Sequence, residues 1–128
     1  FANAYRHINK GSLFIFDVWY TPAVYNLKPE TRVKKIQNEE VKITRIANPV
    51  VLAQQNIVDV EYDFFIETLS TGEIENFKET HSMRHFSSTE IELLAESNGF
   101  RLIDQEEFLT GNAPSKNSWG VCFILERK

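Results

Sequence analysis

The hydrophobic pattern of this chain changes twice along its 128 residues. Residues 13–18 (LFIFDV) are apolar at nearly every position, which predicts a strand covered on both faces, as in a parallel sheet. In residues 58–67 (VDVEYDFFIE) apolar and acidic residues alternate, which predicts a half-solvated antiparallel strand. Residues 119–127 (WGVCFILER) are again apolar on both faces. This order predicts an α/β core that is interrupted by a β insertion.

Helix and turn residues predict the elements between these runs. Residues 1–8 (FANAYRHI) place apolar side chains on one helical face, and Gly11 is positioned for a left-handed cap after this helix. Pro22 and Pro29 interrupt the chain after the first strand, and a short helix could form between them. A strand is expected to begin near Val41.

Three further signals predict how the chain continues. The STG turn at residues 70–72 predicts a hairpin whose second strand covers 73–86. Ser87, with Glu90 three residues later, forms a capping box at the start of a helix. Asn98–Gly99 is expected to end that helix with a left-handed cap.

The last two strands are joined without a helix. The strand that starts at Phe100 and the strand at 119–127 must therefore run antiparallel. Together with residues 13–18 they are expected to share one mixed sheet, in which 119–127 lies beside 13–18 and antiparallel to it. The remaining strands, near 41–48, 57–68 and 73–86, are expected to form an antiparallel meander. Taken alone, the chain reads as α+β.

Composition and charge exclude several classes of partner. The 14 basic and 18 acidic residues give a formal net charge of −4 and form no basic stripe, so we expect no nucleic-acid partner. No apolar stretch approaches the roughly 18 residues that a membrane span needs. The single Cys122 rules out an intrachain disulfide and fits a cytoplasmic location.

Several short motifs, taken in order, resemble a known family. The stretch INKGSLFIFD at residues 8–17 resembles the helix, glycine turn and acid-ended fifth strand of class I S-adenosylmethionine-dependent methyltransferases. The sugar-amine N-methyltransferase branch carries a meander between this strand and the next helix. The residues that are similar to that branch are DxWYxP at 17–22, TR at 44–45, VxY at 60–62, ExH at 79–81, Phe86 and PS at 114–115.

The resemblance implies an α/β fold that is the C-terminal portion of a Rossmann-like methyltransferase. Residues 1–27 and 86–128 would belong to the core, and residues 28–85 would be an inserted antiparallel β meander on the substrate side. The chain has no initiator Met and opens within a predicted helix, so we expect a longer protein. The glycine-rich loop and ribose-binding acid for S-adenosylmethionine would lie upstream. This chain would then supply no cofactor-binding residue and would be inactive alone.

Asp17, Trp19 and Tyr20 stand at the end of the first strand. Ligands of open α/β sheets bind at the carboxyl ends of strands, so we predict that these residues bind the substrate. Aromatic faces suit an amine that becomes cationic on methylation. The alternative is that the two rings cap the edge of the core.

His81 is the candidate catalytic residue. In a regular strand it shares a face with Glu79, and such a pair could orient or deprotonate an acceptor. The alternative is a polar cross-strand pair on a solvated face. His85 follows on the same face with less support from the family pattern. With no fourth ligand nearby, we expect no metal site.

Arg45 and Trp119 complete the predicted substrate-binding residues. Arg45 could contact an anionic or hydroxyl-rich substrate, or it could form an ion pair with acids of the meander. Trp119 could be a wall of the pocket or part of the core. It stands where the resemblance implies an arginine in enzymes that bind a nucleotide diphosphate sugar, and this difference argues against such a substrate.

The sequence therefore predicts part of an S-adenosylmethionine-dependent methyltransferase that acts on a small-molecule acceptor. The alternative is a free-standing α+β domain that binds a ligand or dimerises without catalysis. A homodimer is compatible with both interpretations, and neither involves a nucleic acid or a membrane.

Overall fold

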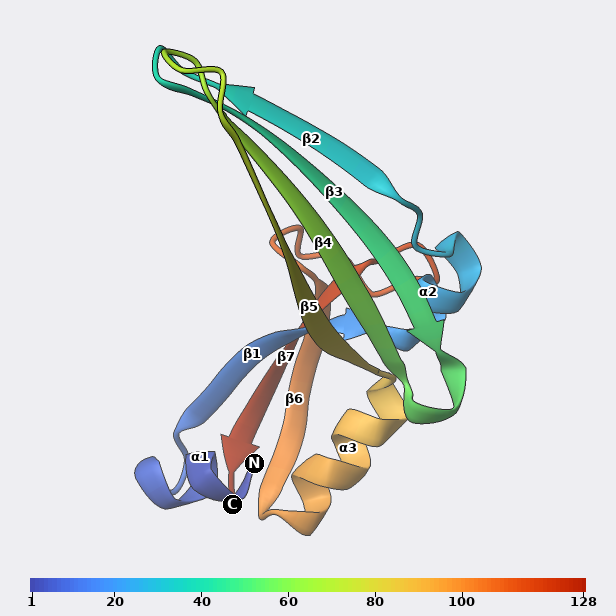
Figure 1. Cartoon of the computed structure of the whole chain (residues 1–128). Helices are drawn as coiled ribbons and strands as arrows, with labels where there is room; N and C mark the ends of the chain where they lie inside the picture. The colour runs from blue at the N-terminus through green and yellow to red at the C-terminus, as the bar shows by residue number, and fades with distance from the viewer. The chain divides into compact units, whose positions relative to one another are not determined.

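The computed structural model describes residues 1–128, and the chain divides into two units (Figure 1). Unit 1 comprises residues 1–28 and 85–128, and unit 2 comprises residues 29–84. The long strand β5 (Ile74–Phe86) belongs to unit 2 except for its last two residues. Two points stay predictions: that unit 1 belongs to a Rossmann-like core, and that unit 2 lies on the substrate side.

Unit 1 is built on a mixed sheet. Strand β7 (Gly120–Arg127) lies between β1 (Leu13–Tyr20) and β6 (Phe100–Glu107) and is antiparallel to both. The end of β5 pairs with β1 in parallel, through Trp19 with His85 and Tyr20 with Phe86. The predicted arrangement of the three core strands is confirmed.

Helices cover one face of this sheet. Helix α3 (Ser88–Ser97) contributes Ile91 and Ala95 to a core whose other buried members come from β6 and β7. Phe1 and Tyr5, at the start of α1 (Ala2–His7), pack against the same core, and both rings contact that of Phe100 edge-on. The buried core residues are Ile91, Ala95, Phe100, Val121, Phe123 and Leu125.

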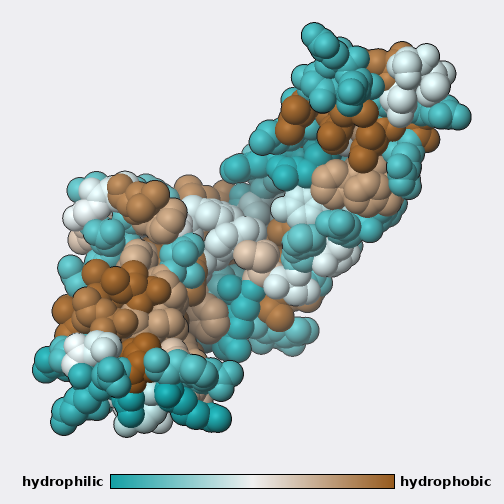
Figure 2. Space-filling view, turned by 90° about the vertical axis from the view of Figure 1, so that its left-hand side faces the viewer, coloured by the Kyte–Doolittle hydropathy of each residue, from teal (hydrophilic) through white to brown (hydrophobic).

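The prediction that β1 is covered on both faces is wrong for this chain. Phe14, Phe16 and Val18 pack on the core, whereas Leu13 and Ile15 are 53% and 57% exposed. Successive side chains of a strand point to opposite faces, so an apolar run predicts two apolar faces but not what covers them. In the space-filling view, hydrophobic residues form a broad surface on unit 1 (Figure 2).

The two predicted helix ends have different outcomes. The cap at Gly11 is wrong, because α1 ends at His7 with an extended Ile8, and Gly11 (φ +79°) lies in the turn before β1. At the second helix, Gly99 has the left-handed conformation (φ +82°) predicted for the end of α3. The capping box is confirmed, since Glu90 N–H donates to Ser87 Oγ and Ser87 N–H donates to Glu90 Oε2.

Unit 2 is an antiparallel meander of four strands. Strands β2 (Arg32–Gln37), β3 (Val41–Leu52), β4 (Ile57–Thr68) and β5 pair in chain order, with a short 3-10 turn, η1 (Ala53–Gln55), between β3 and β4. The meander is confirmed, but β2 was not predicted. Every residue of β2 is exposed. An exposed strand needs no apolar face, and the sequence RVKKIQ accordingly gives no strong apolar pattern from which a strand could be predicted.

The register of unit 2 divides its side chains between two faces, because directly opposed residues share a face. The Tyr62 face carries Arg45, Tyr62, Phe64, Phe77, Glu79 and His81. The Asp63 face carries Ile46, Asn48, Glu61, Asp63, Lys78 and Thr80.

Helix α2 (Thr21–Leu27) lies in unit 1 after β1, where a short helix was expected, and Pro22 stands in its first turn. None of the helices has the length and apolar character that crossing a membrane requires.

Candidate functional site

Two residues predicted to act on the substrate meet at Tyr62. The guanidinium carbon of Arg45, from β3, lies 5.1 Å from the centre of the Tyr62 ring. The His81 ring, from β5, meets the Tyr62 ring edge-on, and the two ring centres are also 5.1 Å apart. The register of three adjacent strands places these side chains together, although they are distant in the sequence.

His81 is oriented by Glu79. Its Nε2 lies 3.1 Å from Glu79 Oε2, and the two side chains are 54% and 48% exposed. When Nε2 carries the proton and donates it to this carboxylate, Nδ1 is the ring atom left to accept a proton. The arrangement has the order of groups that a general base requires, with a carboxylate that orients an accessible imidazole.

Arg45 makes no ion pair with the acids of the meander. Its guanidinium lies over Tyr62, and its Nε has no hydrogen-bond partner although this atom is buried. Asp63 pairs instead with Lys78, at 3.1 Å. The remaining N–H groups of Arg45 are therefore not committed to a carboxylate of the chain.

A second cluster lies in unit 1, at the carboxyl end of β1. The rings of Trp19 and Trp119 are 5.1 Å apart at an interplanar angle of 61°, and both residues are half-buried. Asp17 is exposed two residues before Trp19 and lies opposite Cys122. Burial, followed by the charges of Glu106 and Asp17, raises the pKa of the Cys122 thiol. These two carboxylates make the surface beside the tryptophans negative.

Tyr20 is separated from this pair, because it points to the opposite face of β1. Its hydroxyl lies 3.0 Å from Ser88 Oγ, which in turn donates to Gln105 Oε1 at 2.6 Å. The ring packs against the helix-covered core. Of the three residues predicted at the end of this strand, Asp17 and Trp19 share a face and Tyr20 does not.

The sequence pattern supported a functional role for His85 less than for His81, yet His85 is the histidine that the fold buries. It is fully buried, its Nδ1 lies 2.8 Å from Thr21 Oγ1, and its ring meets that of Tyr25 edge-on at 5.4 Å. It pairs with Trp19 across β1 and β5. Its place immediately before Phe86 and the capping box was the available sequence signal, since both mark the point where β5 enters unit 1.

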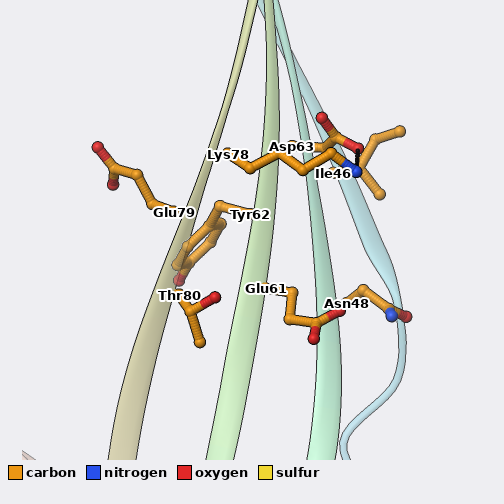
Figure 3. Close-up of a pocket in the computed structure, with 8 residues that line it drawn as sticks. All are labelled: Ile46, Asn48, Glu61, Tyr62, Asp63, Lys78, Glu79 and Thr80. Atoms are coloured by element: carbon orange, nitrogen blue, oxygen red, sulfur yellow. Dashed lines mark ion pairs between the residues drawn. The ribbon is translucent and has the colours of Figure 1, made fainter.

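The Asp63 face carries a polar groove whose lining includes Tyr62 and Glu79 but none of the residues predicted to be catalytic or to bind the substrate (Figure 3). The groove has a volume of about 510 Å³, and its walls include Asn48, Glu61, Thr80 and the Lys78–Asp63 ion pair. Hydrogen bonds from Asn76 and Lys78 lower the pKa of Asp63. In Figure 3 Glu79 lies away from this ion pair, on β5. No group of three or more ligating side chains gathers as a metal site would require.

Comparisons with solved structures identify the fold. The chain is similar to an S-adenosylmethionine-dependent methyltransferase from Clostridium acetobutylicum, at 15% identity and a TM-score of 0.71 over 98% of this chain and 48% of that one. It is also similar to the sugar N-methyltransferase KedS8 from Streptoalloteichus, at 14% identity and a TM-score of 0.75 over 99% and 47% of the two chains. A third similar protein is CalS10, an amino pentose methyltransferase from Micromonospora echinaspora solved with S-adenosylmethionine bound, at 15% identity and a TM-score of 0.73 over 99% and 48%.

These likenesses confirm the predicted fold, which is that of S-adenosylmethionine-dependent methyltransferases, including sugar N-methyltransferases. The chain spans about half the length of the solved proteins it matches. No family model matches the sequence, and a comparison with curated proteins gives no match either.

Proposed function

We propose that this chain is the C-terminal part of an S-adenosylmethionine-dependent methyltransferase and that it supplies side chains to the site of a small-molecule acceptor. One observation carries the proposal. Units 1 and 2 together align with about half of each methyltransferase structure, over nearly the whole of this chain. The half-buried position of Cys122, with no disulfide, supports a cytoplasmic enzyme.

The residues of this chain do not fit the methyl donor itself. A cofactor loop of this fold class needs glycines between a strand and the helix that follows it. The five glycines lie elsewhere: Gly11, Gly72 and Gly111 stand in turns, Gly99 follows a helix and Gly120 begins β7. In the proposed enzyme the cofactor site therefore lies outside this chain, and the cofactor supplies the methyl group when it is bound to the complete enzyme.

In the proposed enzyme, His81 removes the proton of the acceptor at Nδ1, while Glu79 holds Nε2 and stabilises the imidazolium that forms. Arg45 and Tyr62 lie beside this imidazole. The free N–H groups of Arg45 would hold a hydroxyl-rich or anionic part of the acceptor. The acceptor would thus be oriented by Arg45 and deprotonated by His81.

Trp19 and Trp119 would form an aromatic wall for the acceptor, with Asp17 beside them. Two ring faces next to a carboxylate favour an amine, because its charge becomes positive as the methyl group is transferred. Tyr20 would act by positioning the end of β1 through Ser88, and it remains part of the proposed acceptor site in that role.

The test of the catalytic role uses a polypeptide that contains this chain and the upstream half of the fold. His81→Gln should lower kcat by about 10²- to 10⁴-fold, the range for loss of a general base, and should leave cofactor affinity unchanged. His7→Gln is the matched control, since His7 is exposed on α1 and bonds only to the Asn3 carbonyl. An unchanged kcat in a folded His81→Gln enzyme would remove His81 from the mechanism.

The test of the wider proposal is calorimetric. S-adenosylmethionine should bind the longer polypeptide and should not bind residues 1–128 alone. Micromolar binding by residues 1–128 would contradict the proposal that the cofactor site lies outside this chain.

The aromatic wall is tested separately. Trp19→Ala should raise the KM for the acceptor at unchanged cofactor affinity, measured at a matched folded fraction. Arg45→Lys keeps the charge and loses the planar donor arrangement, so a raised KM in this variant would support multidentate binding. An unchanged acceptor KM in Trp19→Ala would exclude Trp19 from acceptor binding, and an unchanged acceptor KM in Arg45→Lys would exclude Arg45.

A further inference from the structure

Residues 108–119 form the loop between β6 and β7 of unit 1 (Figure 1). Hairpin loops usually have about two to five residues, so this loop is long and needs contacts of its own to keep one conformation. Its large apolar residues do not supply them, because Phe108 is 45% exposed and Leu109 is 83% exposed. The loop ends at Trp119, whose ring contacts Trp19. What holds the end of the loop therefore decides where one half of this aromatic pair lies.

A buried hydroxyl group fastens the end of this loop. Ser118 is 1% exposed, and its Oγ donates to Glu107 Oε2, on the last residue of β6, at 2.5 Å. The same oxygen accepts the N–H of Ser115 at 2.9 Å, and Ser115 Oγ lies 3.3 Å from it. A polar group that is removed from water must find its partners within the protein, and losing one of them is costly. Ser118 is thus tied both to the sheet and to the turn that precedes it.

Trp119 is fixed on its other side by the backbone. Its carbonyl oxygen accepts the N–H of Tyr20 at 2.9 Å, so the residue is bonded to the end of β1. One bond of this kind leaves the preceding chain free to turn about it, whereas the Ser118 bond fixes the residue before Trp119 as well. The two anchors together set the direction in which the indole leaves the backbone. A further bond, from Asn26 Nδ2 to Asn117 Oδ1 at 2.9 Å, joins two exposed side chains and lies outside this buried contact.

We propose that Ser118 and Glu107 are positioning residues, which hold the Trp119 ring against Trp19 before the acceptor arrives. Ser118 is buried and cannot itself touch a ligand, so its effect passes through Trp119. A wall that is already ordered loses less conformational entropy on binding, and a fixed ring favours one orientation of the acceptor. The inference rests on the proposed function, because the wall that it describes is the proposed acceptor wall.

A different role for Glu107 is a direct ionic contact with the amine of the acceptor. The contacts favour positioning, because Glu107 Oε2 already accepts the buried Ser118 hydroxyl. The two roles predict different results for Glu107→Gln, which loses the negative charge but keeps an oxygen that can accept the same hydrogen bond. Glu107→Leu keeps the approximate size of the side chain and removes the acceptor altogether. Positioning therefore predicts that Glu107→Gln resembles wild type and that Glu107→Leu does not.

The first experiment measures the ring pair by circular dichroism and needs no acceptor. Trp19 and Trp119 are the two tryptophans of the chain, and rings with centres 5.1 Å apart give a coupled signal that a single indole cannot give. Trp119→Phe defines the spectrum without this coupling. We expect Ser118→Ala and Glu107→Leu to lose the coupled signal and Glu107→Gln to keep it, at a matched folded fraction.

Ser97→Ala is the matched control. This serine also lies in unit 1 and bonds the carbonyl of Leu93, at the end of α3. Asn26→Ala is a second control, since it removes the exposed bond to the loop and leaves Ser118 in place. Both variants should keep the coupled signal. A Ser118→Ala chain that folds and keeps its signal would overturn the proposal, and so would equal losses from Ser118→Ala and Asn26→Ala. If Ser118→Ala does not fold, equal signals from Glu107→Leu and Glu107→Gln would overturn it instead.

The second experiment measures kinetics in the longer polypeptide. Ser118→Ala should lower kcat/KM for the acceptor about fivefold to thirtyfold, the range for losing one contact between a cation and a ring, at unchanged cofactor affinity. If Ser118 acts through Trp119, Ser118→Ala should change kcat/KM by less than about twofold when Trp119 is already alanine. Additive effects of the two changes would overturn the positioning role. If the coupled signal is lost but kcat/KM is unchanged, Ser118 still positions Trp119, and it is the acceptor wall of the proposed function that fails.

Discussion

Units 1 and 2 have different sources of stability. Unit 1 buries Phe100, Phe123 and Leu125 completely under its helices, whereas the fully or largely buried apolar residues of unit 2 are Val58 and Val60. All of β2, and β5 from Ile74 to Arg84, is exposed. Unit 2 therefore depends on strand pairing and on ring contacts between neighbouring strands. Side chains in such a sheet can change with little cost to folding, which makes unit 2 suitable for residues that contact a ligand or a partner.

The largest expected effect concerns burial. Phe100→Ala should cost about 3–5 kcal/mol of unfolding free energy, because the ring is fully buried against Phe1, Tyr5 and Phe14. Phe77→Ala in unit 2 should cost only about 1 kcal/mol, the value of one aromatic pair on a sheet. Urea unfolding of both variants measures the difference. Equal losses would show that unit 2 has a core of its own.

A pair of glycine variants compares the two units at positions where the backbone has a positive φ. Gly99 and Gly72 both have positive φ, so alanine costs each about 1–2 kcal/mol in backbone strain. A Cβ at Gly99 would lie 2.6 Å from Tyr5 Cε2, whereas nothing lies within 4 Å at Gly72. Gly99→Ala should therefore cost roughly 1–3 kcal/mol more than Gly72→Ala in urea unfolding. Similar costs would mean that the Tyr5 ring moves aside freely.

The next effect is that of a helix cap. Ser87→Ala removes the acceptor for Glu90 N–H and should destabilise the chain by about 1 kcal/mol. The side chain of Ser82, which is exposed on the meander, bonds only to Asp59, and its replacement by alanine should change stability by a few tenths of a kcal/mol. Thermal unfolding of the two serine variants separates the contributions. A larger loss from Ser82→Ala would contradict the view that unit 2 tolerates change.

The smallest expected effect is a pH dependence in unit 2. Asn76 and Lys78 lower the pKa of Asp63, so its contribution is fully present above the ordinary value of 3.8. It is lost as the pH falls below that value toward the lowered pKa. The urea midpoint of wild type should exceed that of Asp63→Asn at pH 7, and the gap should close in strong acid. A gap that widens in acid would mean that the pKa is raised.

Local patterns predicted the elements that depend on neighbouring residues. The capping box of Ser87 and Glu90, the hairpin around residues 70–72 and the antiparallel closing strands are all present. These features follow from short-range hydrogen bonding and from the periodicity of apolar side chains. Strand β2 was missed because an exposed edge strand carries little apolar pattern, and Gly11 was misassigned because a glycine serves equally in a turn.

The sequence by itself determined the order of the elements other than β2, the position of the meander and the residue types at the end of β1. Only the tertiary structure decided which of those residues meet. Trp19 contacts Trp119 from 100 positions away, and Arg45 reaches Tyr62 because the register of β3 on β4 places them together. It also decided that Tyr20 turns from Trp19 and that one face of β1 stays open. Periodicity specifies which side chains share a face, whereas contact between strands depends on register and on what packs against that face.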